Sequence, residues 1–466
     1  MEDGGDTVPL LSDGFIDERS LDPAIEEALE ETGVLKPKHS DQFTAQRTKI
    51  MVVMNIVMFF VPISGVTYVP SIPVIQDYFH ATQLEMTLTL VGFCIFIGAM
   101  PLVYGPIADL AGRKPSLIAC LVGYGAANVM AGSSENIWGI IVYRSLIATF
   151  NAGFTTFCTG IISDVVPVED RATSIGVSLL LAMAGTILGS PAAGLVNDFL
   201  SWRMVFYFTA LGAFPVALLV GLAVPETNDF SKPKVSKNPL HALVRLCKWP
   251  LVGMVVPNAF AFGAMYTINS ELSPLLAYYF NLSSAQIGLL YMPFGVGMLV
   301  GTIFGGKISD VARRRFGLGG SLSIALISAV VTAAMTVIYG WVAPSFLWLS
   351  VIIASLTGFG AMASRGVIFT YATELNKDAA GTVTSGLVCV QFAVTVVELF
   401  LAGRLVPPPE KGGIGPGWSF TIVAGLVVVF LPLMIIVIVQ AFRQGPGRPR
   451  MVPEGGDGLL QDNDEL

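Results

Sequence analysis

Residues 105–114 read Gly-Pro-Ile-Ala-Asp-Leu-Ala-Gly-Arg-Lys and form a short loop between two long apolar runs. A related stretch, Gly-Lys-Ile-Ser-Asp-Val-Ala-Arg-Arg-Arg, occupies residues 306–315. Each stretch follows the second apolar run of its half of the chain, and the spacing from glycine to aspartate to arginine is the same. This repetition indicates that the chain consists of two related halves.

Apolar runs of about 20 residues recur along both halves, and each is long enough to cross the roughly 30 Å hydrocarbon core of a bilayer. They lie near residues 50–69, 85–107, 115–132, 138–162, 172–196 and 203–223, and then near 250–275, 284–306, 319–340, 346–370, 382–404 and 417–441. Charged residues make up only 13% of the chain, about half of their share in a soluble domain. We therefore predict an all-α membrane protein with twelve transmembrane helices in two pseudo-symmetric six-helix bundles.

Charge and polarity predict how the chain is divided and oriented. The expected parts are a disordered cytosolic tail at 1–46, bundles at 47–224 and 250–442, a cytosolic linker at 225–249 and a second disordered tail at 443–466. Of 26 Lys and Arg residues, only Arg203, Arg404 and Lys411 fall on the predicted outer side. Positive charge concentrates on the cytosolic side of membrane proteins, so both termini are expected there. We expect the plasma membrane, with the vacuolar membrane as the alternative.

Residues 105–114 resemble the loop signature of the major facilitator superfamily. Within that family, the chain most closely resembles the twelve-span drug:proton antiporter branch. The resemblance covers about residues 50–440 and is clearer in the first half. It implies alternating access, in which two bundles rock around a central substrate site. The sequence has no phosphate-binding loop of the Gly-x4-Gly-Lys-Ser/Thr type, so transport is expected to be driven by a gradient.

The chemistry of the 105–114 loop can also be read from its residues. Gly105 allows close packing at a helix end, and Asp109 can cap the N-terminus of a facing helix. Arg113 needs an acidic partner in a partly buried setting, and Asp164 at the inner end of the fourth span is the candidate. The alternative is a solvated charged turn.

The resemblance adds a mechanism to this loop. It implies that these residues, together with Gly112 and Lys114, form a latch that is made in the outward-facing state and broken in the inward-facing state. The expected counterpart in the second half consists of Asp310, Arg314 and Glu374.

The fifth span resembles the glycine-rich antiporter signature of that branch, with Ser190 in the place where proline is usual. It predicts a pliant, closely packed helix, against the alternative of ordinary small-residue packing. The residues concerned are Gly176, Gly185, Gly189, Pro191 and Gly194.

Four charged residues lie within predicted spans, where a charge is costly and therefore a functional-site candidate. They are Arg144, Glu271, Arg365 and Glu398, with Tyr266 and Asn269 beside Glu271. Arg144 matches the arginine of the family's span-four motif. The alternatives are a structural ion pair for Arg144, and mutual neutralisation across helices or an interfacial position for the others. Polar residues that could line the same cavity are Asn55, Asn151, Asn258 and Gln391.

These observations lead to a leading function and two alternatives. The leading hypothesis is an exporter of a small organic compound, a drug or secondary metabolite, by proton exchange. A proton carrier needs a titratable carboxyl in the membrane; the first span has none, which leaves Glu271 and Glu398. The runner-up is a di- or tricarboxylate carrier, because Arg144 and Arg365 offer two cations, although the two acids offset them. A transporter-like sensor is the third.

The expected partners are a small-molecule substrate, protons in the case of an antiporter, and the lipid bilayer. We expect a monomer without cofactor, metal or nucleic acid, and no enzymatic activity, because the sequence shows no nucleophile, base or metal cluster. The one Asn-x-Ser/Thr sequon, at Asn281, predicts glycosylation on an outer loop.

Overall fold

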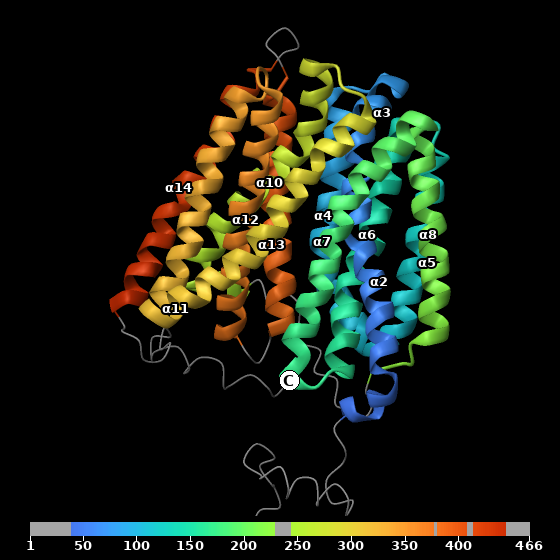
Figure 1. Ribbon diagram of the computed structural model, residues 1–466, viewed down its shortest axis with the longest axis vertical. Coiled ribbons are helices and arrows are strands. Elements are labelled where there is room, and N and C mark those ends of the chain that lie inside the picture. Colours follow the sequence, from blue (N-terminus) through green and yellow to red (C-terminus); the bar gives the residue numbers. More distant parts are fainter. Residues whose placement is uncertain (1–38, 229–243, 377–379, 408–412, 444–466) are drawn as a thin grey trace, which may run out of the picture.

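A computed structural model describes residues 39–228, 244–376, 380–407 and 413–443, and every regular element in these ranges is a helix (Figure 1). The predicted tail residues 1–38 and 444–466, and most of the predicted linker (229–243), lie outside the described part. In Figure 1 the helices of the first half, blue to green, lie beside those of the second half, yellow to red.

Each predicted apolar run coincides with a helix to within a few residues, and the first, 50–69, extends past the end of α2 to η2. The first half contains η1 (His39–Gln46), α2 (Arg47–Val66), η2 (Val69–Ser71), α3 (Ile72–Phe79), α4 (Gln83–Ala111), α5 (Arg113–Gly132), α6 (Ile137–Val165), α7 (Val168–Phe199) and α8 (Trp202–Ala223). The second half contains α10 (Leu251–Phe280), α11 (Ser284–Val342), α12 (Leu347–Leu375), α13 (Ala380–Leu405) and α14 (Pro416–Arg443).

The number of spans agrees with the prediction once α11 is divided. Eleven helical stretches in the described ranges are long and apolar enough to cross a membrane. One of them, α11, has 59 residues, and its backbone leaves the helical conformation at Gly317, where φ is 68°. A bilayer needs about 20 residues per span, so α11 comprises the eighth and ninth spans, and twelve spans result.

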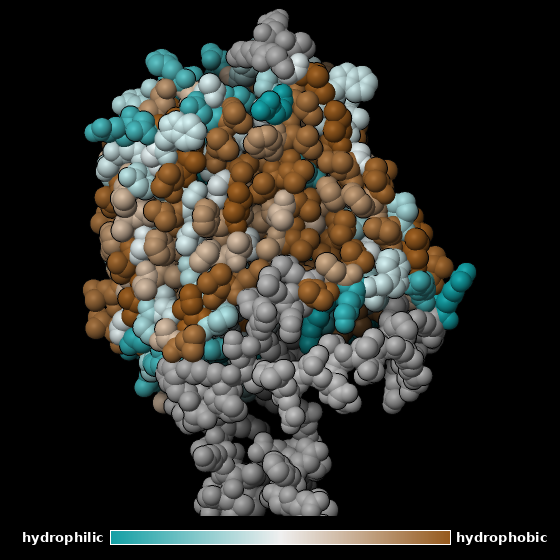
Figure 2. Space-filling view, turned by 180° about the vertical axis from the view of Figure 1, so that it is seen from behind, coloured by the Kyte–Doolittle hydropathy of each residue, from teal (hydrophilic) through white to brown (hydrophobic). Residues whose placement is uncertain are grey.

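The outer surface is apolar enough to need lipid. Figure 2 shows a broad hydrophobic band across one face of the molecule. Large apolar side chains such as Leu211, Leu222 and Val429 are 65%, 77% and 67% exposed. Because helices satisfy their own backbone hydrogen bonds, they can present such surfaces to a hydrocarbon environment.

The two halves contact each other through two pairs of helices, and each pair has one helix from either half. α4, the second span of its half, packs on α13, the fifth span of the other half, and the first part of α11 packs on α7 in the same way. Corresponding spans of the two halves thus pair in the same way, as expected for two related halves.

The contacts between halves extend from the middle of the bundle to the end opposite the first residues of α2 and the last residues of α14. We call that end the far end, and the opposite one the termini end. A Cβ on Gly98 would overlap Phe392, one on Gly403 would overlap Thr87, and one on Gly194 would overlap the Ser284 carbonyl.

The same helix faces are apart at the termini end. Gly105 lies seven residues from Gly98, and Gly381 lies eleven from Phe392, so Gly105 and Gly381 lie on the helix faces that meet at Gly98 and Phe392. A Cβ on Gly105, Gly381 or Gly306 would meet nothing within 4 Å. The halves are therefore closed against each other at the far end and separated at the termini end.

Candidate functional site

The predicted ion pair of the first half is present. Arg113, the first residue of α5, places its Nη1 2.6 Å from Oδ2 of Asp164 near the end of α6. Both side chains are largely buried, with exposed fractions of 20% and 17%. The partner deduced from sequence is therefore confirmed.

A carboxylate that the sequence did not reveal organises this corner. Gly112 adopts φ 91°, a conformation that favours glycine, and it separates α4 from α5. Glu226, just after α8, accepts the backbone N–H groups of Arg113 (3.0 Å) and Lys114 (3.2 Å). An anion at a helix N-terminus satisfies free N–H groups and the helix dipole. The only available signal was an acidic residue directly after the sixth span.

The two residues after Glu226 extend the same contact. The Thr227 hydroxyl donates to Oδ2 of Asp164 at 3.0 Å, and the Asn228 side chain donates to the Asp109 carbonyl at 3.2 Å. The beginning of the predicted linker thus packs against the first bundle. It belongs to the structure around the ion pair.

The structure shows the predicted latch in one conformation, and its opening when the bundles rock stays a prediction. The Arg113–Asp164 pair is made although the halves are separated at this end. The physical reason is that α5 and α6 belong to one bundle, so the pair does not depend on contact between halves. Asp109 is exposed, and no described residue forms a hydrogen bond or salt bridge with its carboxylate. A contact of Gly105 and Asp109 with the other half stays a prediction.

The second-half ion pair uses Arg313 instead of the predicted Arg314. Arg313 binds Glu374 through two bonds of 2.6 and 2.8 Å, whereas Arg314 is exposed. The reason lies in where the helix breaks. In the first half the helix breaks at Gly112, directly before Arg113. In the second half α11 continues to Gly317, so Arg314 is still helical, and Arg313 is the residue that faces α12. Asp310 lies close enough to Arg313 to interact electrostatically.

Arg144 of α6 is buried without an acidic partner among the described residues. Its exposed fraction is 1%. The guanidinium carbon lies 3.7 Å from the centre of the Tyr68 ring and 4.8 Å from that of Phe93, and Nη1 donates to the Ser64 carbonyl at 3.4 Å. Tyr266 of the other half is within electrostatic range. Cation–π contacts therefore stabilise the Arg144 guanidinium. The structural ion pair, which was the alternative for this residue, is not observed among the described residues.

Arg365 of α12 has a similar environment. Its guanidinium carbon lies 5.1 Å from the Phe262 ring and 4.9 Å from the Phe369 ring. In the described ranges no carboxylate forms a salt bridge with it. Arg365 lies nine residues before Glu374, whereas Arg144 lies twenty before Asp164. At 1.5 Å per helical residue, Arg365 is about 16 Å nearer the termini end.

An aromatic cluster lies between the two arginines, and sequence reasoning did not identify it as a group. Phe262 and Tyr266 of α10 and Phe392 of α13 have ring centres 5.4–6.2 Å apart. Phe262 contacts Arg365, and Tyr266 is near Arg144. Phe392 also meets Gly98 of α4. The arginines and rings therefore lie where the two halves meet.

The two acids lie elsewhere, inside the second half. Glu271 is 4% exposed and interacts electrostatically with Tyr291 and Tyr339 of α11. Asn269 contributes its carbonyl, which accepts the Tyr291 hydroxyl at 2.6 Å. Glu398 is fully buried, with its carboxylate against Gly263 of α10. Mutual neutralisation of the in-span charges is thus not observed among the described residues.

The polar residues expected to line a cavity instead connect helices. Asn151 donates to the Val61 carbonyl at 2.8 Å, which joins α6 to α2. Asn258 donates to Ser364 at 3.0 Å and accepts from Gln391 at 2.9 Å, which joins α10 to α12 and α13. Asn55 accepts the Ser178 hydroxyl at 2.6 Å.

The small residues of α7 pack closely at four of the five predicted positions. A Cβ on Gly185 would overlap the Phe59 carbonyl of α2, and one on Gly189 would meet Val66 at 2.9 Å. Gly194 faces Ser284 of α11, and Pro191 lies against Gly288. Gly176 differs from the prediction, since a Cβ there would meet nothing within 4 Å. Gly176 lies near the termini end, where the halves are separated.

A polar contact closes the far end, and it was not predicted. The Asp198 carboxylate accepts the backbone N–H groups of Ser284 (3.1 Å) and Ala285 (2.9 Å), and Asn197 donates to the Ser284 hydroxyl. Asp198 ends the α7 region of the first half, and Ser284 begins α11 of the second. The contact therefore joins the two halves directly. Nearby, Asn281 ends α10 and is exposed; its glycosylation stays a prediction.

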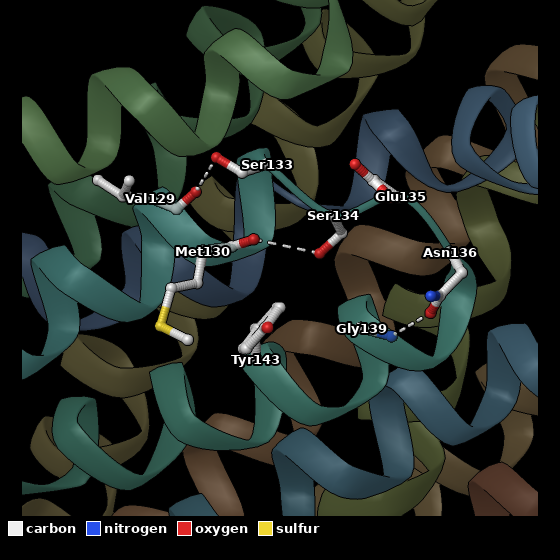
Figure 3. A pocket seen from close by; sticks show the side chains of 8 residues that line it. All are labelled: Val129, Met130, Ser133, Ser134, Glu135, Asn136, Gly139 and Tyr143. Atoms are coloured by element: carbon white, nitrogen blue, oxygen red, sulfur yellow. Dashed lines mark hydrogen bonds between the residues drawn. The ribbon is translucent and has the colours of Figure 1, made fainter.

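A small pocket lies between the far ends of α5 and α6 (Figure 3). The Ser133 and Ser134 hydroxyl groups that line it bond carbonyls of the preceding turn, and the Asn136 side chain accepts the Gly139 N–H at 2.8 Å. Because its polar groups bond locally and it lies within one half, this pocket is separate from the site that contains Arg144 and Arg365. It is a feature of the helix hairpin.

Comparison with known families and proteins gives a consistent result. The family model described as "Major Facilitator Superfamily" matches residues 54–397. The chain is 23% identical to "MFS antiporter QDR2" of Candida albicans, covering 88% of this chain and 92% of the relative. It is 23% identical to "Citrate exporter 1" of Aspergillus niger, covering 93% of each.

Solved structures show a similar fold. A bacterial homolog of the human lysosomal transporter Spinster, in an inward-facing and unoccupied conformation, matches with a TM-score of 0.70 at 18% identity, over 87% of this chain and 99% of the other. The human organic anion transporter MFSD10 matches with a TM-score of 0.59 at 16% identity, over 83% and 99%. At these identities the likeness establishes the fold alone.

Proposed function

Because the chain belongs to the major facilitator superfamily, and so is a transporter of small molecules rather than an enzyme, we propose that it exports a small organic anion in exchange for protons. The observation that carries this proposal is the position of the in-span charges. Arg144 and Arg365 lie unpaired where the halves meet, among the residues that the structure describes. Both acids are inside the second half.

The separation of the arginines from the acids favours one sign of substrate charge, which the composition alone did not. Counted along the sequence, two cations and two anions cancel. In space, the boundary between the halves carries the positive charges, and a site of one sign concentrates ligands of the other. A carboxylate that reaches this boundary can satisfy the donors of an arginine, which suit planar oxyanions. A cationic compound would be repelled.

Alternating access is supported by the asymmetry of the two ends. Asp198 and the overlapping glycines hold the halves together at the far end, while Gly105 and Gly381 have open space at the termini end. With the termini cytosolic, as the positive charges predict, a substrate enters from the cytosol. The name of one relative, "Citrate exporter 1", supports export of an anion.

A second candidate, export of an uncharged aromatic compound, is favoured by the cluster of Phe262, Tyr266 and Phe392. Aromatic rings bind planar apolar ligands by offset stacking or edge-to-face contact. Such a compound would use the same boundary but would not need the arginines.

The test is counterflow in proteoliposomes that contain the purified protein and unlabelled citrate, succinate or benzoate. We expect uptake of the labelled anion, and a decrease of about tenfold or more in R144Q and R365Q, since a hydrogen bond to a charged group contributes about 1.5–3 kcal/mol. R404Q is the matched control, because Arg404 is exposed near the far end.

Wild-type rates in R144Q and R365Q would overturn the proposal. Counterflow of an uncharged aromatic dye with none of the three anions would establish the second candidate in its place.

A further inference from the structure

Glu398 has an environment unlike that of the bonded carboxylates in the structure. It lies on α13 with an exposed fraction of 0%, and neither carboxylate oxygen has a hydrogen-bond partner in the described chain. Asp164, Glu226 and Glu374, by contrast, each bind an arginine or several N–H groups. Glu398 is therefore a buried carboxyl without a counter-charge.

The cost of burying a charge favours the neutral form of such a group. An ionised carboxylate transferred from water into an apolar interior costs at least several kcal/mol when it is neither paired nor hydrogen-bonded. Protonation removes most of that cost, and the group then resembles any other polar side chain.

The residues around Glu398 supply no counter-charge or hydrogen-bond donor that could stabilise an ionised carboxylate. The carboxyl lies in a notch of α10, since a Cβ on Gly263 would overlap Oε2 of Glu398. The helices packed against α13 present Tyr266 and Glu271 from α10, Cys94 and Tyr104 from α4 and Arg365 from α12 within the membrane region. None of these five forms a hydrogen bond or salt bridge with Glu398. The apolar part of α14 has no titratable residue before Arg443.

The position of Glu398 links it to the movement between halves. Five residues later on α13, Gly403 packs tightly against Thr87 of α4, and this contact closes the far end. Opening the far end separates α4 from α13 and admits water to the side of the α10–α13 seam. A carboxyl that gains water can ionise.

A buried polar chain connects the same seam to the arginine of the proposed site. Gln391, two helical turns before Glu398, donates to Asn258, which donates to Ser364. Ser364 immediately precedes Arg365. On α10, Gly263 follows Phe262, whose ring lies 5.1 Å from Arg365. A shift of α10 at the substrate site would therefore move the notch that holds Glu398.

We propose that Glu398 is a proton-binding site coupled to the far end: it is protonated while α4 packs on α13 and ionised when they part. Closing the far end then transfers one proton from water on that side to the carboxylate. Exchange requires that this proton leave to the termini side before the far end reopens, and a shift of α10 by an anion bound near Arg365 would provide that release, so the role of Glu398 in transport rests on the proposed function. The conformational coupling itself does not.

The experiment measures conformation against pH without any substrate. Spin labels are placed on L200C and W348C, two exposed far-end positions in different halves, with the native cysteines replaced. We expect low pH to favour the short distance and high pH the long one, because the neutral form prefers the closed far end. One linked proton changes the ratio of the two states by up to about tenfold per pH unit.

E398Q, which is neutral at every pH, should stay closed and change by less than about twofold over the same range. E271Q is the matched control, because Glu271 is also buried in the second half but faces α11; it should keep the wild-type response. If E398Q does not fold, G263A tests the same site, since it fills the notch and should shift the pH midpoint.

A wild-type pH response in E398Q or, where only G263A folds, an unchanged midpoint would overturn the proposal. Because no substrate is added, that result would leave the anion proposal standing. Absence of anion counterflow, conversely, would leave the Glu398 measurement unaffected.

Discussion

The Glu226 carboxylate accepts the backbone N–H of Arg113 at 3.0 Å, a contact between residues 113 positions apart. It fixes the first turn of α5 against the end of α8. With its backbone held there, Arg113 directs its guanidinium to Asp164. One carboxylate thus positions a helix terminus, and the helix terminus positions an ion pair.

Removing this carboxylate should destabilise the first bundle. E226A leaves the N–H groups of Arg113 and Lys114 without their acceptor, a loss of about 2 kcal/mol judged from other caps. We expect a lower melting temperature in detergent. E135A, which removes an exposed far-end glutamate, is the control, and equal melting of the two variants would contradict the role of Glu226.

A methyl group at Gly112 should have a comparable effect for a different reason. Its φ of 91° is unfavourable for alanine, and the added Cβ would lie 2.6 Å from Oε2 of Glu226. We expect G112A to cost about 1–3 kcal/mol of stability, measured by thermal unfolding. G105A should unfold like the wild type, since Gly105 has open space here, yet transport should fall if this glycine meets the other half when the termini end closes.

The Arg113–Asp164 pair can be tested by exchanging its charges. R113D and D164R each leave a largely buried charge unpaired, so each should reduce transport strongly. The double variant should recover part of the activity, although the Thr227 bond to Asp164 is lost. Counterflow normalised to the amount of folded protein is the measurement. No recovery in the double variant would mean that the pair matters through something other than charge.

Substituting the neighbouring residues Arg313 and Arg314 separately tests the second-half ion pair. R313Q breaks the two bonds to Glu374, whereas R314Q removes an exposed charge. The pair is more than a third exposed, so we expect only a modest loss of stability in R313Q, below about 1 kcal/mol, but a clear loss of transport. Equal transport by the two variants would argue against a specific role for Arg313.

Loss of the Asp198 cap should open the far end. D198A leaves the N–H groups of Ser284 and Ala285 unsatisfied, and a cap contributes about 1 kcal/mol. We expect the far-end-open fraction to increase about fivefold, as measured by spin-label distances between the halves. D77A removes an exposed acid of the same end and should change nothing. A wild-type distance distribution in D198A would show that Asp198 does not hold the gate.

The sequence by itself determined the spans, the two halves and the Arg113–Asp164 pair. The spans and halves follow from hydropathy and from the repeated loop, because a spanning helix satisfies its own backbone hydrogen bonds. The pair follows because a partly buried arginine at the end of a span is stabilised by a nearby acid. It also identified each in-span charge, since any charge in an apolar run stands out.

Only the tertiary structure decided which of these groups meet. The choice of Arg313 over Arg314 depends on where α11 breaks, and a single residue turns a helical side chain by about 100°. The role of Glu226 depends on the packing of α8 beside α5, which no local pattern contains. That the arginines face the boundary while Glu398 faces Gly263 depends on how helices far apart in the chain are rotated against each other.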